Sequence, residues 1–179
     1  MAQPLFWNQA QAEPKRSHRF LVTFDLPSGT NTQIFARTFV KPAYTIGVTE
    51  HKFLDKTFYY PGAVSWNEIT AQFVNSASPD MDSELQNILL LSGYTLPSAV
   101  DGGAALNSRT IGKFAAVNAI GAKVRVSELN AAGATLGTYV LNNPFITSVA
   151  YGTLDYGSED LLTVDINFRY DWATYQVRS

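Results

Sequence analysis

The feature that most constrains this chain is an alternating pattern that runs without a break from Leu162 to Trp172. The apolar members are Leu162, Val164, Ile166, Phe168, Tyr170 and Trp172, and the polar members between them are Thr163, Asp165, Asn167, Arg169 and Asp171. Because successive side chains of a strand point to opposite faces, the pattern predicts one long strand with a dry face and a wet face. Such a strand belongs to the wall of a sheet or barrel that is covered on one side only.

Length and composition narrow the class of protein. A chain of 179 residues suits a single domain spanning residues 1–179, which buries roughly 70% of its unfolded surface and needs no disulfide or metal. The absence of cysteine excludes thiolate catalysis, cysteine-ligated zinc and disulfides. A net charge of −2 argues against a dedicated nucleic-acid binder, which carries a concentrated basic surface.

The sequence contains no recognisable secretory signal or membrane-spanning segment. Polar residues interrupt the apolar groups near Lys15, Arg16 and Arg19, so no secretory signal is predicted there. The densest apolar stretch, Ile88 to Leu91, is far too short to span a bilayer. The sequence therefore predicts no membrane insertion.

The chain divides into five predicted segments. They are an N-terminal leader or arm (1–18), a first β-block (19–75), a helix (78–92), a loop (94–121) and a C-terminal β-block (122–175). Within the loop, Phe114 to Ile120 is predicted as a short helical piece. The fold class is thus mainly β with one flanking helix, in an antiparallel barrel or sandwich.

The first β-block begins with a predicted hairpin. Phe20, Val22 and Phe24 mark a strand, and Pro27-Ser28-Gly29 is a turn signal. The apolar run from Ile34 to Val40 reads as the partner strand, which Pro42 ends.

An aromatic excursion at residues 52–66 follows an extended stretch from Tyr44 to Phe53. Phe58, Tyr59 and Tyr60 lead into Pro61-Gly62, which suits a type II turn, and Trp66 opens the next strand through Phe73. Two interpretations stand side by side: the aromatic residues fold back on their own core, or they project and anchor a partner. Lys52, Asp55 and Lys56 are either solvated charges or members of pairs between subunits.

The helix has clear start and stop signals. Ser78 is the expected N-cap and Pro79 the first helical residue, with acidic residues in the first turn at Asp80, Asp82 and Glu84. An apolar face is formed by Met81, Leu85, Ile88 and Leu89, and Gly93 suits the left-handed conformation after the helix.

The inventory of reactive groups supports no enzyme. His18 and His51 lack metal-ligand spacing and read as surface histidines. The carboxylate pairs Glu159 with Asp160 and Asp165 with Asp171 are explained by a turn and by a wet strand face rather than by a glycosidase dyad. No phosphate-binding loop follows Gly102-Gly103, so neither a catalytic residue nor a metal or cofactor is predicted.

The order of these elements resembles that of the tail tube proteins of contractile-tailed (myovirus-type) bacteriophages, which are related to type VI secretion and pyocin tube proteins. The residues that carry the resemblance are S-W-N-E-I-T at Ser65 to Thr70, N-P-F-I-T-S-V at Asn143 to Val149, L-D-Y at Leu154 to Tyr156 and L-T-V-D-I-N-F-R-Y-D-W at Leu162 to Trp172. The likeness covers roughly Phe20 to Trp172, and its motifs are patterns of residue type.

The resemblance implies a structural virion protein of the tail, assembled in the host cytoplasm. Hexameric rings of such a protein stack into the inner tube and form a conduit for DNA ejection. The implied partners are other copies of the chain, the tail sheath, the baseplate, the tail terminator, the tape measure protein and phage DNA held without sequence specificity. No cofactor is implied.

Two sets of residues take roles under this resemblance. The excursion matches the long hairpin that such proteins send to the next ring, which makes the inter-subunit or inter-ring contact residues Lys52, Lys56, Phe58, Tyr59, Tyr60, Pro61 and Trp66. The wet face of the last strand then lines the lumen through Asp165, Asn167, Arg169 and Asp171.

Two alternatives remain open from the sequence. With the same architecture, the chain is a baseplate tube initiator or a type VI secretion or pyocin-type tube protein. From another class, it is a monomeric β-barrel that binds a small ligand in a pocket lined by Tyr59, Tyr60 and Trp66.

Overall fold

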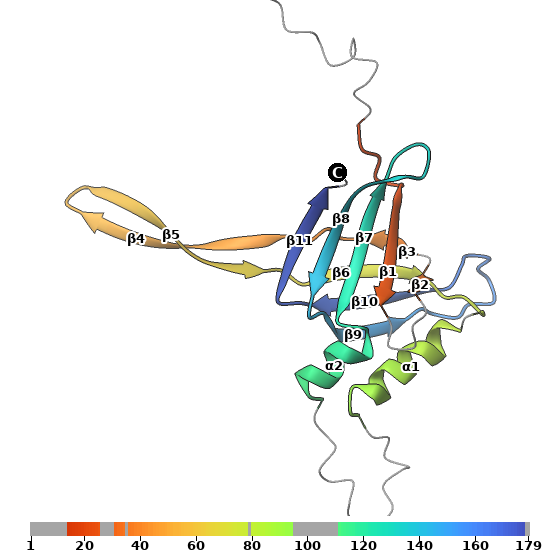
Figure 1. The fold of residues 1–179 in the computed structure, drawn as a ribbon. Coiled ribbons are helices and arrows are strands. Elements are labelled where there is room, and N and C mark those ends of the chain that lie inside the picture. Colours follow the sequence, from red (N-terminus) through yellow and green to blue (C-terminus); the bar gives the residue numbers. More distant parts are fainter. Residues whose placement is uncertain (1–13, 26–30, 35, 79, 95–110, 178–179) are drawn as a thin grey trace, which may run out of the picture.

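Residues 14–25, 31–34, 36–78, 80–94 and 111–177 are described by this computed structural model. They form two packed antiparallel sheets, a separate two-stranded hairpin and two helices. Figure 1 shows the strands of one sheet running across those of the other. The structure confirms the predicted antiparallel sandwich with a hairpin arm, and it adds a second helix.

The first sheet has five strands in the order β11-β8-β7-β1-β2, all antiparallel. Their bounds are β1 (Phe20–Asp25), β2 (Asn31–Ile34), β7 (Lys123–Leu129), β8 (Thr135–Asn142) and β11 (Trp172–Val177). Asn130 closes the turn between β7 and β8, where its Oδ1 accepts from the backbone N–H groups of Ala132 and Ala134 at 2.9 Å each. Gly133 has a φ of 77°, which a glycine adopts without strain.

The second sheet has four strands in the order β3-β6-β10-β9. Their bounds are β3 (Ala36–Phe39), β6 (Ile69–Val74), β9 (Phe145–Tyr151) and β10 (Thr163–Arg169). The register places Ala36, Phe73, Val164 and Tyr151 in one row across the sheet. Ala36 of the edge strand β3 and Tyr151 of the edge strand β9 therefore lie at the same position along the strand direction, on opposite edges of the sheet.

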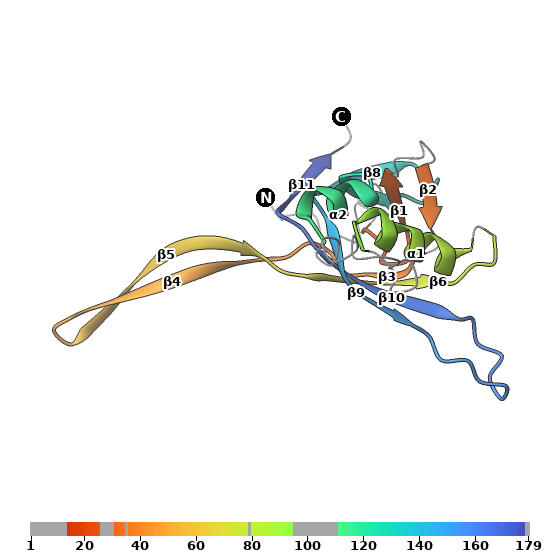
Figure 2. The same cartoon turned by 90° about the horizontal axis from the view of Figure 1, so that it is seen from below.

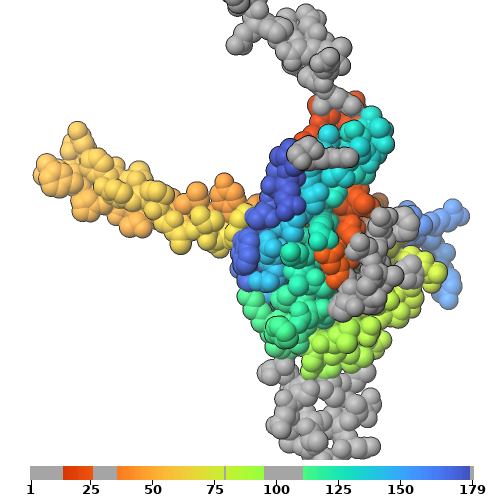
Figure 3. Space-filling view, viewed as in Figure 1, coloured from red at the N-terminus to blue at the C-terminus, as the bar shows by residue number. Residues whose placement is uncertain are grey.

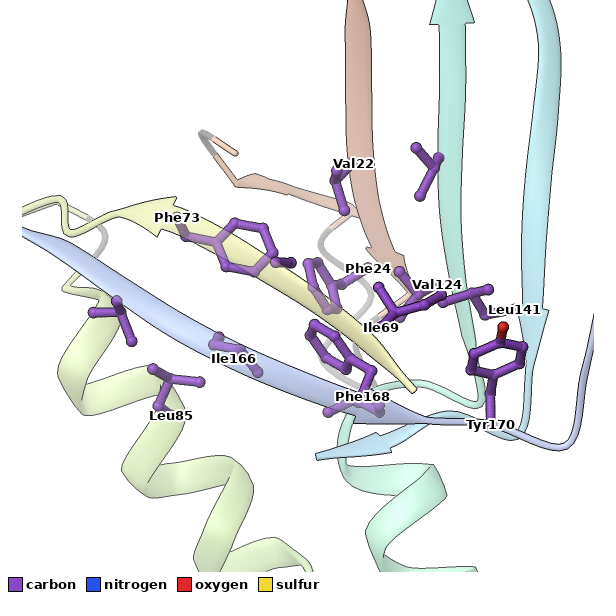
Figure 4. Packing of buried hydrophobic residues seen from close by; sticks show 14 of the residues in the cluster. Val22, Phe24, Ile69, Phe73, Leu85, Val124, Leu141, Ile166, Phe168 and Tyr170 are labelled. Atoms are coloured by element: carbon purple, nitrogen blue, oxygen red, sulfur yellow. The ribbon is translucent and has the colours of Figure 1, made fainter. Parts of the chain in front are cut away.

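The core lies between the two sheets. Phe24 of β1 packs against Phe73 of β6 and Phe168 of β10, with ring centroids 5.9 Å apart in both pairs. Figure 4 shows this aromatic group between the sheets. Alternate residues of β1, β6, β7 and β10 supply further apolar contacts, so both β-blocks of the sequence contribute to a single core.

The long strand predicted over Leu162 to Trp172 is wrong in one respect: it is two strands. β10 ends at Arg169 and β11 begins at Trp172 in the other sheet, so the chain turns a corner at Tyr170 and Asp171. The backbone N–H of Asp171 donates to the carbonyl oxygen of Asn142 at 3.1 Å across this corner. The dry face holds for Val164, Ile166, Phe168 and Tyr170, which are buried, whereas Trp172 is exposed because it lies beyond the corner.

The predicted partner of the first strand is also divided. Residues 31–34 pair with β1 as β2, whereas Ala36–Phe39 pair with β6 as β3. The chain therefore crosses from one sheet to the other within the apolar run that suggested a single strand. The turn signal at Pro27 to Gly29 lies outside the described residues.

Two helices lie below β9 in the view of Figure 1. α1 (Met81–Leu91) begins later than predicted: its N-cap is Asp80, whose side chain accepts from the backbone N–H of Asp82 at 3.3 Å. Ser78 is not the cap because a β-bridge joins Ala77 to Asp80 and keeps this stretch non-helical, while an aspartate caps a helix as well as a serine. Gly93 has a φ of 97°, as its predicted role requires.

The second helix, α2 (Lys113–Ala119), lies within the segment predicted as a loop, where a short helical piece was expected. Ala116, Val117 and Ala119 are buried, so the helix covers the end of the core. Residues 95–110 of that segment lie outside the described chain.

Candidate assembly surfaces

The most prominent feature of the surface is a long hairpin, here called the arm, made of β4 (Tyr44–Phe53) and β5 (Lys56–Trp66). Figures 1 and 2 show it extending away from the sandwich. In the space-filling view it stands free of the body for most of its length (Figure 3). All its residues are exposed except Trp66.

The turn of the arm is not where the sequence predicted it. The reversal occurs at Leu54 and Asp55, and Leu54 takes a φ of 55°. Pro61 and Gly62 instead lie within β5, at a register shift opposite Gly47. Proline lacks an N–H donor and is tolerated at such an irregularity, where the ladder is already interrupted.

Both faces of the arm carry large apolar side chains. Beyond the register shift, Tyr59 lies on the same face as Val48 and Pro61, and Phe58 and Tyr60 lie on the opposite face. Tyr59 is 65% exposed and Tyr60 is 56% exposed. An isolated two-stranded ribbon is marginal in water, so an arm with two apolar faces is suited to contact with other surfaces on both sides.

The base of the arm is attached to the sandwich by aromatic contacts. The Trp66 ring lies 5.4 Å from that of Tyr44 and 5.9 Å from that of Tyr170, centroid to centroid. The N–H of Asn67 donates to the carbonyl oxygen of Ala43 at 2.9 Å, which closes the base. Trp66 thus differs from the other predicted contact residues, because it packs within its own subunit.

The charged residues of the arm are solvated within this chain. Lys52 and Lys56 lie near the tip and form no ion pair with any residue that the structure describes. Phe53, beside them, is 62% exposed. The tip therefore presents both cationic and aromatic side chains to the solvent.

The second candidate surface is the outer face of the four-stranded sheet. Asp165, Asn167 and Arg169 of β10 point away from the core, as the alternation predicted. Asn167 Nδ2 donates to Ser148 Oγ on β9 at 2.9 Å. On β10 this face is polar and mixed in charge.

Asp171 does not share that face. It lies at the corner, where both carboxylate oxygens accept from Lys113 Nζ of α2 at 2.7 and 2.8 Å. Asn143 Nδ2 donates to it as well, at 2.9 Å. The hydrogen bond from Lys113, followed by that from Asn143, holds the pKa of Asp171 below its usual value, so this residue ties α2 to the corner.

A cluster that the sequence analysis did not predict surrounds Glu128 of β7. This side chain is 9% exposed and its two oxygens form ion pairs with Lys15 and Lys41. Lys15 Nζ also donates to the hydroxyl of Tyr175 at 2.7 Å. Burial alone would raise the pKa of Glu128, but the two lysines outweigh that effect and lower it. The only sequence signal was a glutamate at a core-facing position of an alternating strand.

The candidate catalytic groups do not converge. Asp165 lies on the outer sheet face and Asp171 at the corner, and His51 lies on the arm opposite Phe58. Within the described ranges no three His, Asp or Glu side chains are grouped as metal ligands. No helix of the described chain is long and apolar enough to cross a membrane.

No protein-family model and no curated protein matches the sequence. Solved structures do match over nearly the whole chain. A chain in the baseplate of the anti-feeding prophage, solved with sixfold symmetry, has a TM-score of 0.65 and 20% identity over 93% of this chain and 98% of its own. The tube-terminating cap of the same prophage has a TM-score of 0.65 and 18% identity over 94% of this chain and 95% of its own.

A third match is a chain in the extended sheath-tube complex of an extracellular contractile injection system, PVC. Its TM-score is 0.61 at 18% identity, over 98% of this chain and 99% of its own. These neighbours are structural parts of injection machines rather than enzymes. This chain has the fold of the tube-type proteins of contractile injection systems, as the resemblance in its sequence predicted.

Proposed function

We propose that this protein forms the inner tube of a contractile tail, as hexameric rings that stack into a conduit for DNA. The observation that carries the proposal is the four-stranded sheet. One of its faces is buried in the core and the other is polar, and its outer strands β3 and β9 each pair on one side only within the described chain. Such a sheet can be continued by copies of itself into a closed wall.

In that wall the polar face lines the lumen. Thr70 and Gln72 of β6 lie beside Asn167 and Asp165 of β10 on this face. Arg169 is the one basic residue of β10 there, against the acidic Asp165. A lining of mixed charge leaves the DNA hydrated and does not bind its phosphates tightly.

The arm is the contact between rings in this proposal. A long hairpin with apolar side chains on both faces is stabilised when it lies between two other surfaces, as stacking provides. Lys52, Lys56, Phe58, Tyr59, Tyr60 and Pro61 form this contact. Trp66 fixes the direction in which the arm leaves the sandwich.

The proposed partners follow from this position in the machine. The tube would contact the sheath along its length, the baseplate at one end and the terminator at the other, with the tape measure protein and DNA inside. The match to a chain in a sheath-tube complex supports these partners. The proposed location is the virion tail.

A role at one end of the tube is the second candidate, because chains in a baseplate and in a tube cap match this one as closely as a chain in a sheath-tube complex. The ligand-binding alternative has less support. Tyr59 lies opposite Glu50 and Trp66 opposite Tyr44, so seven strand residues, about 20 Å, separate the two aromatic side chains. Tyr59, Tyr60 and Trp66 therefore do not line one pocket.

Negative-stain electron microscopy over a range of protein concentrations, with sedimentation velocity in parallel, tests the proposal. We expect rings and hollow stacked tubes. A protein that forms single rings but never tubes supports the end-of-tube role, and a monomer at every concentration contradicts both.

A further inference from the structure

The two edges of the four-stranded sheet carry opposite charge. We propose that the basic edge beside β3 binds the acidic start of α1 in a second copy of this chain, and that this pairing sets the direction and level at which subunits join in a ring. The inference deepens the proposed function and rests on it. It concerns a contact within the ring, distinct from the arm.

The basic edge surrounds a hollow of about 570 Å³ beside β3. Its cationic lining consists of Lys15, Arg16, Arg19, Arg37 and Lys41. These are five of the 13 lysines and arginines of a chain whose net charge is −2. Glu128 is the only carboxylate of the lining, and it is already shared between Lys15 and Lys41.

Arg37 belongs to the edge strand β3 itself. It lies in β3 at the register shift between Ala36 and Thr38, and it is exposed. It forms no ion pair with any residue in the described ranges. An exposed arginine at an unpaired edge is available to a carboxylate of another subunit.

The acidic edge lies on the other side of the sheet. Asp80, Asp82, Ser83 and Gln86 of the α1 region line a hollow together with Tyr151, the last residue of β9. No lysine or arginine occurs between residues 57 and 108, or between residues 126 and 168. The segments that build this edge therefore contain carboxylates without compensating cations.

The register brings the two edges to the same level. The row Ala36, Phe73, Val164, Tyr151 runs straight across the sheet, so the start of β3 and the end of β9 lie opposite each other. Figure 1 shows the helices below β9 and the N-terminal end of β1 on the far side of the sheet. When one copy continues the sheet of the next from β3 to β9, Arg37 comes to the level of Tyr151 and of the neighbour's α1 start.

Charge complementarity of this kind also excludes wrong pairings. Joining β3 to β3 would bring two basic edges together, and joining β9 to β9 would oppose two acidic helix starts. Only the head-to-tail arrangement pairs opposite charges, and a head-to-tail contact is the kind that closes into rings.

Charge reversal tests the pairing with the full chain. Arg37→Glu and Asp82→Arg are each expected to raise the protein concentration needed for ring formation about tenfold, since each places like charges in contact. An equimolar mixture of the two variants is expected to form rings again, because alternating subunits then meet only opposite charges, and a six-membered ring can alternate. Lys123→Glu, an exposed reversal on β7, is the matched control.

The outcomes separate this inference from the proposed function. Wild-type protein that forms no rings contradicts the proposed function, and the inference with it. If the wild type assembles, two results overturn the inference alone: single variants that assemble as well as the wild type, or impaired variants whose mixture stays impaired. Circular dichroism of each variant shows whether it is folded.

Discussion

The Tyr175 side chain lies directly over Gly137 on the neighbouring strand, so closely that a Cβ on Gly137 would stand 2.2 Å from the Tyr175 hydroxyl oxygen. The same ring packs against Tyr139 with centroids 4.6 Å apart. Its hydroxyl accepts from Lys15 and donates to Glu128 Oε2 at 3.2 Å. The glycine therefore makes room for the aromatic side of the Glu128 cluster.

Gly137→Ala is expected to destabilise the protein by about 1–3 kcal/mol, because the added methyl group displaces the Tyr175 ring. Chemical denaturation measures the free energy of unfolding. In a Tyr175→Ala background the same substitution should cost far less, since the space is then empty. An equal cost in both backgrounds would show that the two residues are not in contact.

The Glu128 cluster gives the protein a defined pH dependence. The pKa of Glu128 is lowered below its usual 4.5, so its carboxylate stabilises the fold at neutral pH and this contribution is lost as the pH falls through the lowered pKa. The pKa of Lys15 is raised above its usual 10.5 by Glu128 and Tyr175, so its contribution is complete below that value and is lost at still higher pH.

Thermal unfolding of the wild type and of Glu128→Gln checks this dependence. The Tm difference between them should be largest near neutral pH and should shrink as the pH falls through the lowered pKa of Glu128 and its carboxylate becomes protonated. Glu159→Gln, in the exposed turn before β10, should leave Tm nearly unchanged throughout. A constant difference for Glu128→Gln across the range would contradict the ion-pair account.

Tyr59→Ala combined with Tyr60→Ala is expected to prevent tube growth while leaving Tm unchanged, since both side chains are exposed on the arm and outside the core. Lys56→Glu should act in the same direction. Tyr156→Ala, which removes an exposed tyrosine in the β9–β10 connection, is the control. If electron microscopy shows tubes of normal length from the arm variants, the arm does not form the contact between rings.

The path of the arm should also depend on Gly62 and Gly47, whose backbones lie close together across the hairpin. A Cβ on Gly62 would lie 3.2 Å from the carbonyl oxygen of Gly47, a backbone atom that moves only if the two strands separate. Gly62→Val is therefore expected to alter the course of the arm and lengthen the lag before tubes appear, with no change in Tm. Light scattering during assembly measures the lag, and an unchanged lag would show that the course of the arm is irrelevant to growth.

The sequence correctly predicted the strands in which every second side chain is buried in the core. β1, β6, β7 and β10 follow this rule, because burial on one face imposes a period of two. The break at Tyr170 and Asp171 was not visible, since alternation continues unchanged where a chain passes from one sheet to the other. Pattern alone does not state which sheet a strand joins.

The arm shows a second limit of sequence reasoning. Pro61-Gly62 is a strong turn signal, yet the structure uses it to relieve a register shift and turns at Leu54, a residue with little turn preference. The contact role predicted for the aromatic residues came from the family resemblance, whereas the packing of Trp66 at the base of the arm is visible only in the structure. The opposed charges of the two sheet edges could not be foreseen, because they depend on which strands lie at the edges.

The most direct test of the central claim is labelling of a single cysteine on the four-stranded sheet, which is possible because the chain has none of its own. Asp165→Cys is exposed on the polar face in the isolated subunit, and Lys123→Cys is exposed on the other sheet. If the polar face lines the lumen, a bulky maleimide should label both sites in dissociated subunits but only the Lys123→Cys site in intact tubes. Equal labelling of Asp165→Cys in tubes and in subunits would contradict the account.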